Sequence, residues 1–138
     1  FGKMKDIVVV GKGQSELDEY IETAAKKQGR YTRGEPDPSG GWYFRSDHFN
    51  FAKIGIPSLY VENGSVSVEH GEEWGEAQKE KYNNERYHSP GDEYNKSWDL
   101  SGNIDDMRLL FDVGYRLSNE KSFPGWKPGS EFKAIREK

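Results

Sequence analysis

The run Ile7-Val8-Val9-Val10 is the strongest strand signal in the chain, and the turn sequence Gly11-Lys12-Gly13 closes it. A continuous run of β-branched residues is typical of a strand that is buried on both faces of a sheet. Apolar residues then recur at helical spacing from Leu17 to Ala25, after Ser15 as a candidate N-cap and before Gly29 as a helix stop. A buried strand followed by an amphipathic helix is typical of α/β proteins.

The remaining elements extend this pattern. We predict strands over 31–33 and 57–62, and helices over 48–54, 73–82 and about 101–118. On the last helix one apolar stripe contains Leu100, Ile104, Met107, Phe111 and Gly114. Residues 119–138 are expected to form an extended tail. The fold class is therefore α/β, with a partial mixed β-sheet and packed helices in a single piece over 1–138.

Composition limits the classes of function. The chain has 138 residues with a net charge of −4, so it lacks the basic excess that binds a nucleic-acid backbone. It contains no cysteine, which excludes disulfides and thiolate metal sites. No apolar stretch approaches the roughly 20 residues of a membrane span. Because Phe1 is not an initiator methionine, we expect the chain to be an excised or processed part of a longer protein.

The segment Tyr87-His88-Ser89-Pro90-Gly91-Asp92 has the chemistry of a metal ligand with supporting groups. A neutral imidazole binds Zn²⁺ well, and a ligating histidine usually donates its other N–H to a carboxylate, here Asp92. Tyr87 can donate a phenol hydrogen to an oxyanion. The alternatives are a surface histidine at 88 and a packing tyrosine at 87.

A second candidate segment is Arg45-Ser46-Asp47-His48. Asp47 and His48 form a candidate ligand pair, although adjacent side chains seldom face one point. Asp47 serves equally well as the cap of a helix that begins at His48. The other histidine, His70, lies in an acidic stretch and is expected to be solvated.

The combined motifs resemble a known family. Ser46-Asp47-His48 followed by Phe51 and Gly55-Ile56-Pro57, and then Tyr87-His88 with Asp92, is similar to the C-terminal part of the co-catalytic di-zinc exopeptidases. That family includes secreted bacterial aminopeptidases, glutamate carboxypeptidase and, more distantly, glutaminyl cyclase. The resemblance implies the C-terminal part of a three-layer zinc-exopeptidase fold, of the phosphorylase/hydrolase-like type.

The resemblance also implies roles for individual residues. His88 matches the last zinc ligand, and Tyr87 matches the position that helps to hold the tetrahedral intermediate. Ser46, Asp47 and His48 match a segment that lines the site, and Arg45 beside them is placed to touch the substrate. Asp92 supports His88 from the second coordination shell. Two zinc ions are expected in the intact enzyme, but the family's other ligands and its general base, which precede the first strand in relatives, have no counterpart here.

The function implied is the removal of N-terminal residues from peptides by a zinc aminopeptidase, with this chain inactive on its own. The expected partners are a peptide substrate and the remainder of the parent chain. Missing neighbour strands would leave sheet edges and helix faces bare, so self-association is expected as well. Relatives of this kind imply a periplasmic or secreted location. Two alternatives stay open: a non-catalytic binding module of the same fold, as in the transferrin receptor, and a glutaminyl cyclase-like acyl transferase.

Overall fold

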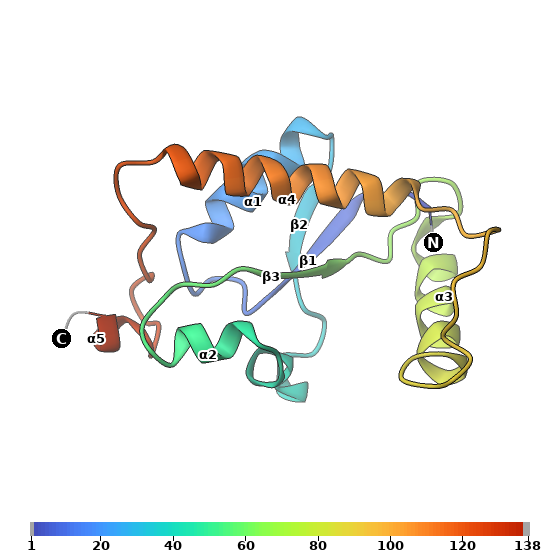
Figure 1. The fold of residues 1–138 in the computed structure, drawn as a ribbon, viewed down its shortest axis with the longest axis horizontal. Helices are drawn as coiled ribbons and strands as arrows, with labels where there is room; N and C mark the ends of the chain where they lie inside the picture. The colour runs from blue at the N-terminus through green and yellow to red at the C-terminus, as the bar shows by residue number, and fades with distance from the viewer. Residues whose placement is uncertain (1, 137–138) are drawn as a thin grey trace.

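A mixed three-stranded sheet forms the centre of the computed structural model, which describes residues 2–136. The strands are β1 (Asp6–Val10), β2 (Tyr31–Gly34) and β3 (Tyr60–Asn63), in the order β2-β1-β3. β2 is parallel to β1 and β3 is antiparallel to it. The predicted α/β fold with a partial mixed sheet is confirmed (Figure 1).

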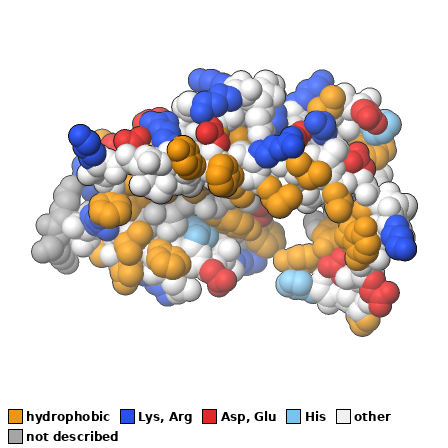
Figure 2. Space-filling model, turned by 45° about the horizontal axis from the view of Figure 1, so that its top comes forward, with side chains coloured by type: hydrophobic (Ala, Val, Ile, Leu, Met, Phe, Trp, Pro, Cys, Tyr) orange, Lys and Arg blue, Asp and Glu red, His pale blue; other side chains and the backbone are white. Residues whose placement is uncertain are grey.

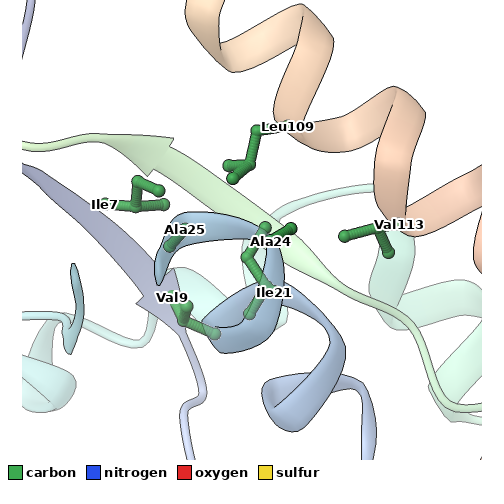
Figure 3. Packing of buried hydrophobic residues seen from close by; sticks show 7 residues of the cluster. All are labelled: Ile7, Val9, Ile21, Ala24, Ala25, Leu109 and Val113. Atoms are coloured by element: carbon green, nitrogen blue, oxygen red, sulfur yellow. The ribbon is translucent and has the colours of Figure 1, made fainter. Parts of the chain in front are cut away.

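Helices α1 (Leu17–Lys27) and α4 (Ser101–Asn119) cover one face of the sheet. α1 is the crossover that a parallel β1–β2 pair requires. Ile7 and Val9 of β1 point toward this layer (Figure 3). The cluster that they form is completed by Ile21, Ala24, Ala25, Leu109 and Val113.

Shorter elements cover the opposite face, so the molecule has three layers (Figure 1). These elements are the 3-10 helices η1 (Pro38–Gly40) and η2 (Trp42–Arg45), and the helix α2 (His48–Ala52). Val8 and Val10 of β1 point into this layer, because side chains alternate along a strand. They contact a second buried cluster that contains Tyr43, Ala52, Trp126 and Phe132.

The tail closes the second layer. It is extended after α4 and ends in the one-turn helix α5 (Lys133–Arg136), so a helical turn interrupts the tail expected over 119–138. Trp126 is 6% exposed, and its indole N–H donates to the Gly55 carbonyl at 2.9 Å. The Lys127 N–H donates to the Gln14 carbonyl at 2.9 Å. The tail is thereby fixed to the turn between β1 and α1.

Helix α4 presents its expected apolar stripe to solvent. Its sheet-facing side is instead formed by Leu109 and Val113, which are 1% and 5% exposed. Met107 and Phe111 in the stripe are 63% and 73% exposed. Figure 2 shows hydrophobic side chains along this face of the molecule. A covering partner for the stripe, whether a second copy or the remainder of a longer chain, stays a prediction.

Helix α3 (Gly71–Glu85) extends away from the sheet at one end of the molecule (Figure 1). The part of α3 nearer its N-terminus is anchored. The Gly75 backbone packs so closely on the Ser65 carbonyl that there is no room for a Cβ. Glu72 accepts from Arg33 of β2 at 2.8 Å, and Lys79 donates to the Asn63 carbonyl at 3.0 Å. Among the residues described, no helix is long and apolar enough to cross a bilayer.

Candidate functional site

The candidate site lies at the edge of the sheet where the two parallel strands end. β1 ends at Val10 and β2 at Gly34, and the first residue of β3, Tyr60, pairs with Val10. Three chain segments therefore meet at one edge. In open α/β sheets, ligands bind outside the carboxyl ends of the strands.

Four side chains gather at this edge, and we call Glu35, Tyr43, His48 and Tyr60 the edge cluster. The Gly11 N–H, just after β1, donates to Glu35 Oε1 at 3.2 Å. A Cβ on Gly11 would lie 2.3 Å from the Tyr43 ring, and its φ of +71° favours glycine. Gly11 is therefore what allows the Tyr43 ring to close over the end of β1.

His48 is held between two aromatic rings. Its imidazole lies edge-on to Tyr43, with ring centroids 4.6 Å apart, and 4.9 Å from the ring of Tyr60. Both ring nitrogens are buried, and neither has a hydrogen-bond partner in the described part of the chain. Burial lowers the pKa of His48, which keeps the imidazole neutral at pH 7. A neutral imidazole can accept a proton or a hydrogen bond from a ligand.

The two tyrosines of the edge cluster stay protonated. Burial, with a smaller contribution from Glu131, raises the pKa of Tyr43 to about 12. Burial and the 2.8 Å hydrogen bond to Glu62 raise the pKa of Tyr60 to about 12. Both phenols are therefore hydrogen donors at neutral pH.

Further polar atoms of the edge cluster are buried without a partner among residues 2–136, namely the Tyr43 hydroxyl and Glu35 Oε2. An unpaired buried polar atom costs about 1–3 kcal/mol, and such atoms in native proteins need an explanation. Together with the His48 nitrogens, these atoms indicate a place where a ligand or another part of a protein completes the hydrogen bonding.

Tyr87 and His88 lie just beyond the end of α3. His88 has a φ of +56°, which is uncommon for a residue with a side chain. Its ring stacks on Tyr87 with centroids 3.9 Å apart, and both residues are exposed. Asp92, the predicted support for His88, instead accepts a hydrogen bond from Tyr82 at 2.8 Å.

Tyr87 acts electrostatically on one residue of the edge cluster. Its phenol is close enough to Tyr60 to add to the rise in the pKa of that residue, after burial and Glu62. Of the two segments singled out in the sequence, 45–48 and 87–92, one residue each interacts with Tyr60, namely His48 through its ring and Tyr87 electrostatically. Tyr60 is the residue that links them.

The residues beside His48 lie outside the cluster. Arg45 is exposed and stacks over the Trp42 ring at 5.3 Å. Asp47 is exposed, and it caps α2 with no side-chain hydrogen bond. The Ser46 carbonyl accepts from the Phe49 N–H at 3.1 Å, which starts the turn into α2. Their predicted roles toward a substrate stay predictions.

The sequence patterns did not single out Glu35, Tyr43 or Tyr60. Glu35 directly follows β2 and Tyr60 begins β3, so their positions at strand ends were the available signal. Strand-end positions predict a shared site only when the strand order β2-β1-β3 is known, because this order brings the strand ends together.

The described residues contain no group of three or more His, Asp or Glu side chains that could hold a metal ion. Zinc sites in proteins use three or four protein ligands. His88 and the residues around it therefore do not form a zinc site by themselves.

The left-handed backbone at His88 leads to a stability prediction. For residues with a Cβ this conformation costs about 1–2 kcal/mol, and glycine avoids the cost. We expect the free energy of unfolding of the His88→Gly variant to be about 1 kcal/mol higher than that of the His88→Ala variant, as measured by urea denaturation. His70, with a φ of −115°, is the matched control, and there the glycine variant should be no more stable than the alanine variant. Equal stability of the two His88 variants would show that the backbone at this position is unstrained.

Comparison with known proteins identifies the family. Residues 2–111, most of the chain, match the model of Peptidase family M28. No curated protein and no solved structure matches the chain. The matched segment contains the sheet, the edge cluster and Tyr87-His88, and it agrees with the predicted resemblance to zinc exopeptidases. The chain belongs to Peptidase family M28.

Proposed function

We propose that the chain is the C-terminal part of the catalytic domain of a zinc-dependent aminopeptidase, which removes N-terminal residues from peptides. The observation that carries the proposal is the family match across the segment that holds both the edge cluster and Tyr87-His88. A peptidase of this family acts on peptide bonds. Restriction to the N-terminal residue is the finer part of the proposal, and it rests on the motif resemblance.

In this proposal the chain supplies one wall of the active site. His88 contributes one zinc ligand, and the remaining ligands come from residues outside 1–138. The exposed Tyr87 donates its phenol hydrogen to the oxyanion that develops on the scissile carbonyl. The edge cluster lies in this wall, where the protonated Tyr43 phenol and the neutral His48 imidazole have unused hydrogen-bonding capacity and Tyr60 donates its hydroxyl hydrogen to Glu62. Arg45 and Ser46 border the wall, and Asp92 holds the loop after α3 through Tyr82.

A second candidate is a binding module with the same fold and no catalysis. The observation that favours it is the lack of a converging metal-ligand set among residues 2–136. Zinc content of the complete polypeptide that contains this chain distinguishes the two candidates. The binding module should hold no zinc, whereas the peptidase should.

The test uses leucine p-nitroanilide and its N-acetylated form. The complete polypeptide should release nitroaniline from the free-amine substrate only, should lose activity with a chelator and should regain it with zinc. The chain of 138 residues alone should be inactive. His88→Ala in the complete polypeptide should lower the bound zinc, measured by mass spectrometry. A complete polypeptide that lacks both zinc and activity would contradict the proposal, and cleavage of the acetylated substrate would contradict the restriction to N-terminal residues.

A further inference from the structure

A groove of about 880 Å³ runs between α3 and the chain that follows it. In Figure 1 this chain returns alongside α3 toward the start of α4. The volume is in the range of ligand-binding clefts, about 300–1,000 Å³. We call it the α3 groove.

Aromatic side chains from both sides line the α3 groove. Trp74 and Tyr82 come from α3, and Tyr94 and Trp98 come from the returning chain. Tyr94 and Trp98 meet edge to face with centroids 5.9 Å apart, and they are 69% and 37% exposed. Rings at such sites are available for contact with a ligand, and tyrosine and tryptophan dominate binding energies at protein surfaces.

The polar lining is suited to a peptide backbone. Asn63, Gln78 and Asn103 line the groove, and an amide side chain can both donate and accept a hydrogen bond. Arg86 and Lys81 alternate with carboxylates such as Glu85, so neither sign of charge dominates. This mixture is unsuited to a polyanion and is suited to a polar, uncharged chain.

One end of the groove lies beside Tyr87. Its lining includes Tyr82, Arg86 and Asp92, and the Tyr82 ring lies 6.1 Å from that of Tyr87. Along the axis of α3 the distance from Trp74 to Arg86 is about 18 Å. An extended peptide of about five residues has the same length. A peptide that leaves the site at Tyr87 can therefore run along the whole groove.

We propose that the α3 groove binds the part of the peptide substrate that lies C-terminal to the scissile bond. The inference rests on the proposed function and names its substrate class, which is peptides of about six residues. The first residue occupies the site, and about five further residues fit the groove. Such peptides are preferred over aminoacyl derivatives, because only they reach Tyr94 and Trp98.

The experiment compares leucine p-nitroanilide with a series of leucine-initiated peptides of increasing length, using the complete polypeptide. The value of kcat/KM should rise with length and level off near six residues. Tyr94→Ala should lower kcat/KM for the hexapeptide about tenfold and change the anilide rate less than about twofold. Tyr115→Ala, which removes a tyrosine of similar exposure from α4, is the control and should change neither rate.

Two outcomes separate this proposal from the proposed function. An active enzyme with no length dependence, or a Tyr94→Ala variant that behaves like Tyr115→Ala, would overturn the groove while the peptidase function stands. If the anilide is not cleaved at all, the peptidase function fails. The groove is then tested by the fluorescence anisotropy of a fluorescein-labelled leucine hexapeptide. Binding that Tyr94→Ala weakens about tenfold would support the groove as a peptide site, and absence of binding would overturn it.

Discussion

Replacing Asp6 with alanine is expected to lower the free energy of unfolding by about 3–5 kcal/mol, the cost of breaking a buried ion pair by removing one partner. Asp6 is fully buried in β1. Its carboxylate lies 2.7 Å from Arg33 Nε, and it accepts the backbone N–H groups of Ser65 at 3.3 Å and Val66 at 2.8 Å. Alanine would remove the carboxylate beside Arg33 Nε, leaving that guanidinium only its bonds to Glu72 and Ser65, and would leave two backbone donors without their acceptor.

The position of Asp6 explains why the effect should be large. The carboxylate joins β1 to β2 through Arg33 and to the segment that leaves β3 through Val66. Gly64 lies so close that a Cβ there would sit 2.0 Å from the Asp6 carboxylate. The backbone therefore packs closely around this one side chain.

The free energy of unfolding of Asp6→Ala is measured by urea denaturation, with circular dichroism as the signal. Asp112→Ala is the matched control, because Asp112 forms an exposed ion pair with Lys27 at 2.8 Å. Exposed pairs contribute about 0–1 kcal/mol, so this variant should unfold nearly as the parent does. If the Asp6 and Asp112 variants lost equal stability, the buried carboxylate would not organise the fold as we describe.

Replacing Tyr87 with phenylalanine is expected to lower kcat of the complete polypeptide about 10²–10³-fold, the usual cost of removing one donor to an oxyanion. The phenylalanine ring can keep the stacking with His88, so only the hydroxyl is lost. In residues 2–136 that hydroxyl has no hydrogen-bond partner, which leaves it free for the substrate. The interaction forms mainly in the transition state, so KM should change little.

Steady-state kinetics on leucine p-nitroanilide measure this prediction. Tyr115→Phe removes a hydroxyl from the exposed face of α4 and should leave kcat unchanged. A rise in KM at constant kcat for Tyr87→Phe would indicate that the phenol binds the substrate without stabilising the oxyanion. An unchanged rate would mean that Tyr87 only packs against His88.

The sequence allowed individual strands and helices to be predicted where local pattern and burial agree. The run Ile7–Val10 is buried along its whole length, and the helical spacing from Leu17 gives α1. Such segments carry their own signal, because the residues that prefer a strand or helix are also those that become buried. The motifs at 46–48 and 87–88 likewise pointed to the family that the comparison identified.

Other features depend on contacts between distant segments. α4 carries two apolar faces, one with Leu109 and Val113 and one with Met107 and Phe111, and the 3.6-residue period fits both. Only the packing of α4 against α1 determines that the face with Leu109 and Val113 is the buried one. Asp6 looks like a surface residue in the sequence, because its partners Arg33 and Val66 lie far along the chain.

Helix α3 also has a consequence for insertions and deletions. It packs at Gly75 against Ser65, just after β3, and leads at its other end to Tyr87-His88, so the number of residues between sets where the two rings point. Deleting one residue would shift everything beyond it by about 1.5 Å and rotate it by about 100° around the helix axis. The segment from Gly75 to Glu85 should therefore tolerate substitutions on its exposed side but no change in length, even though most of it lies far from the sheet.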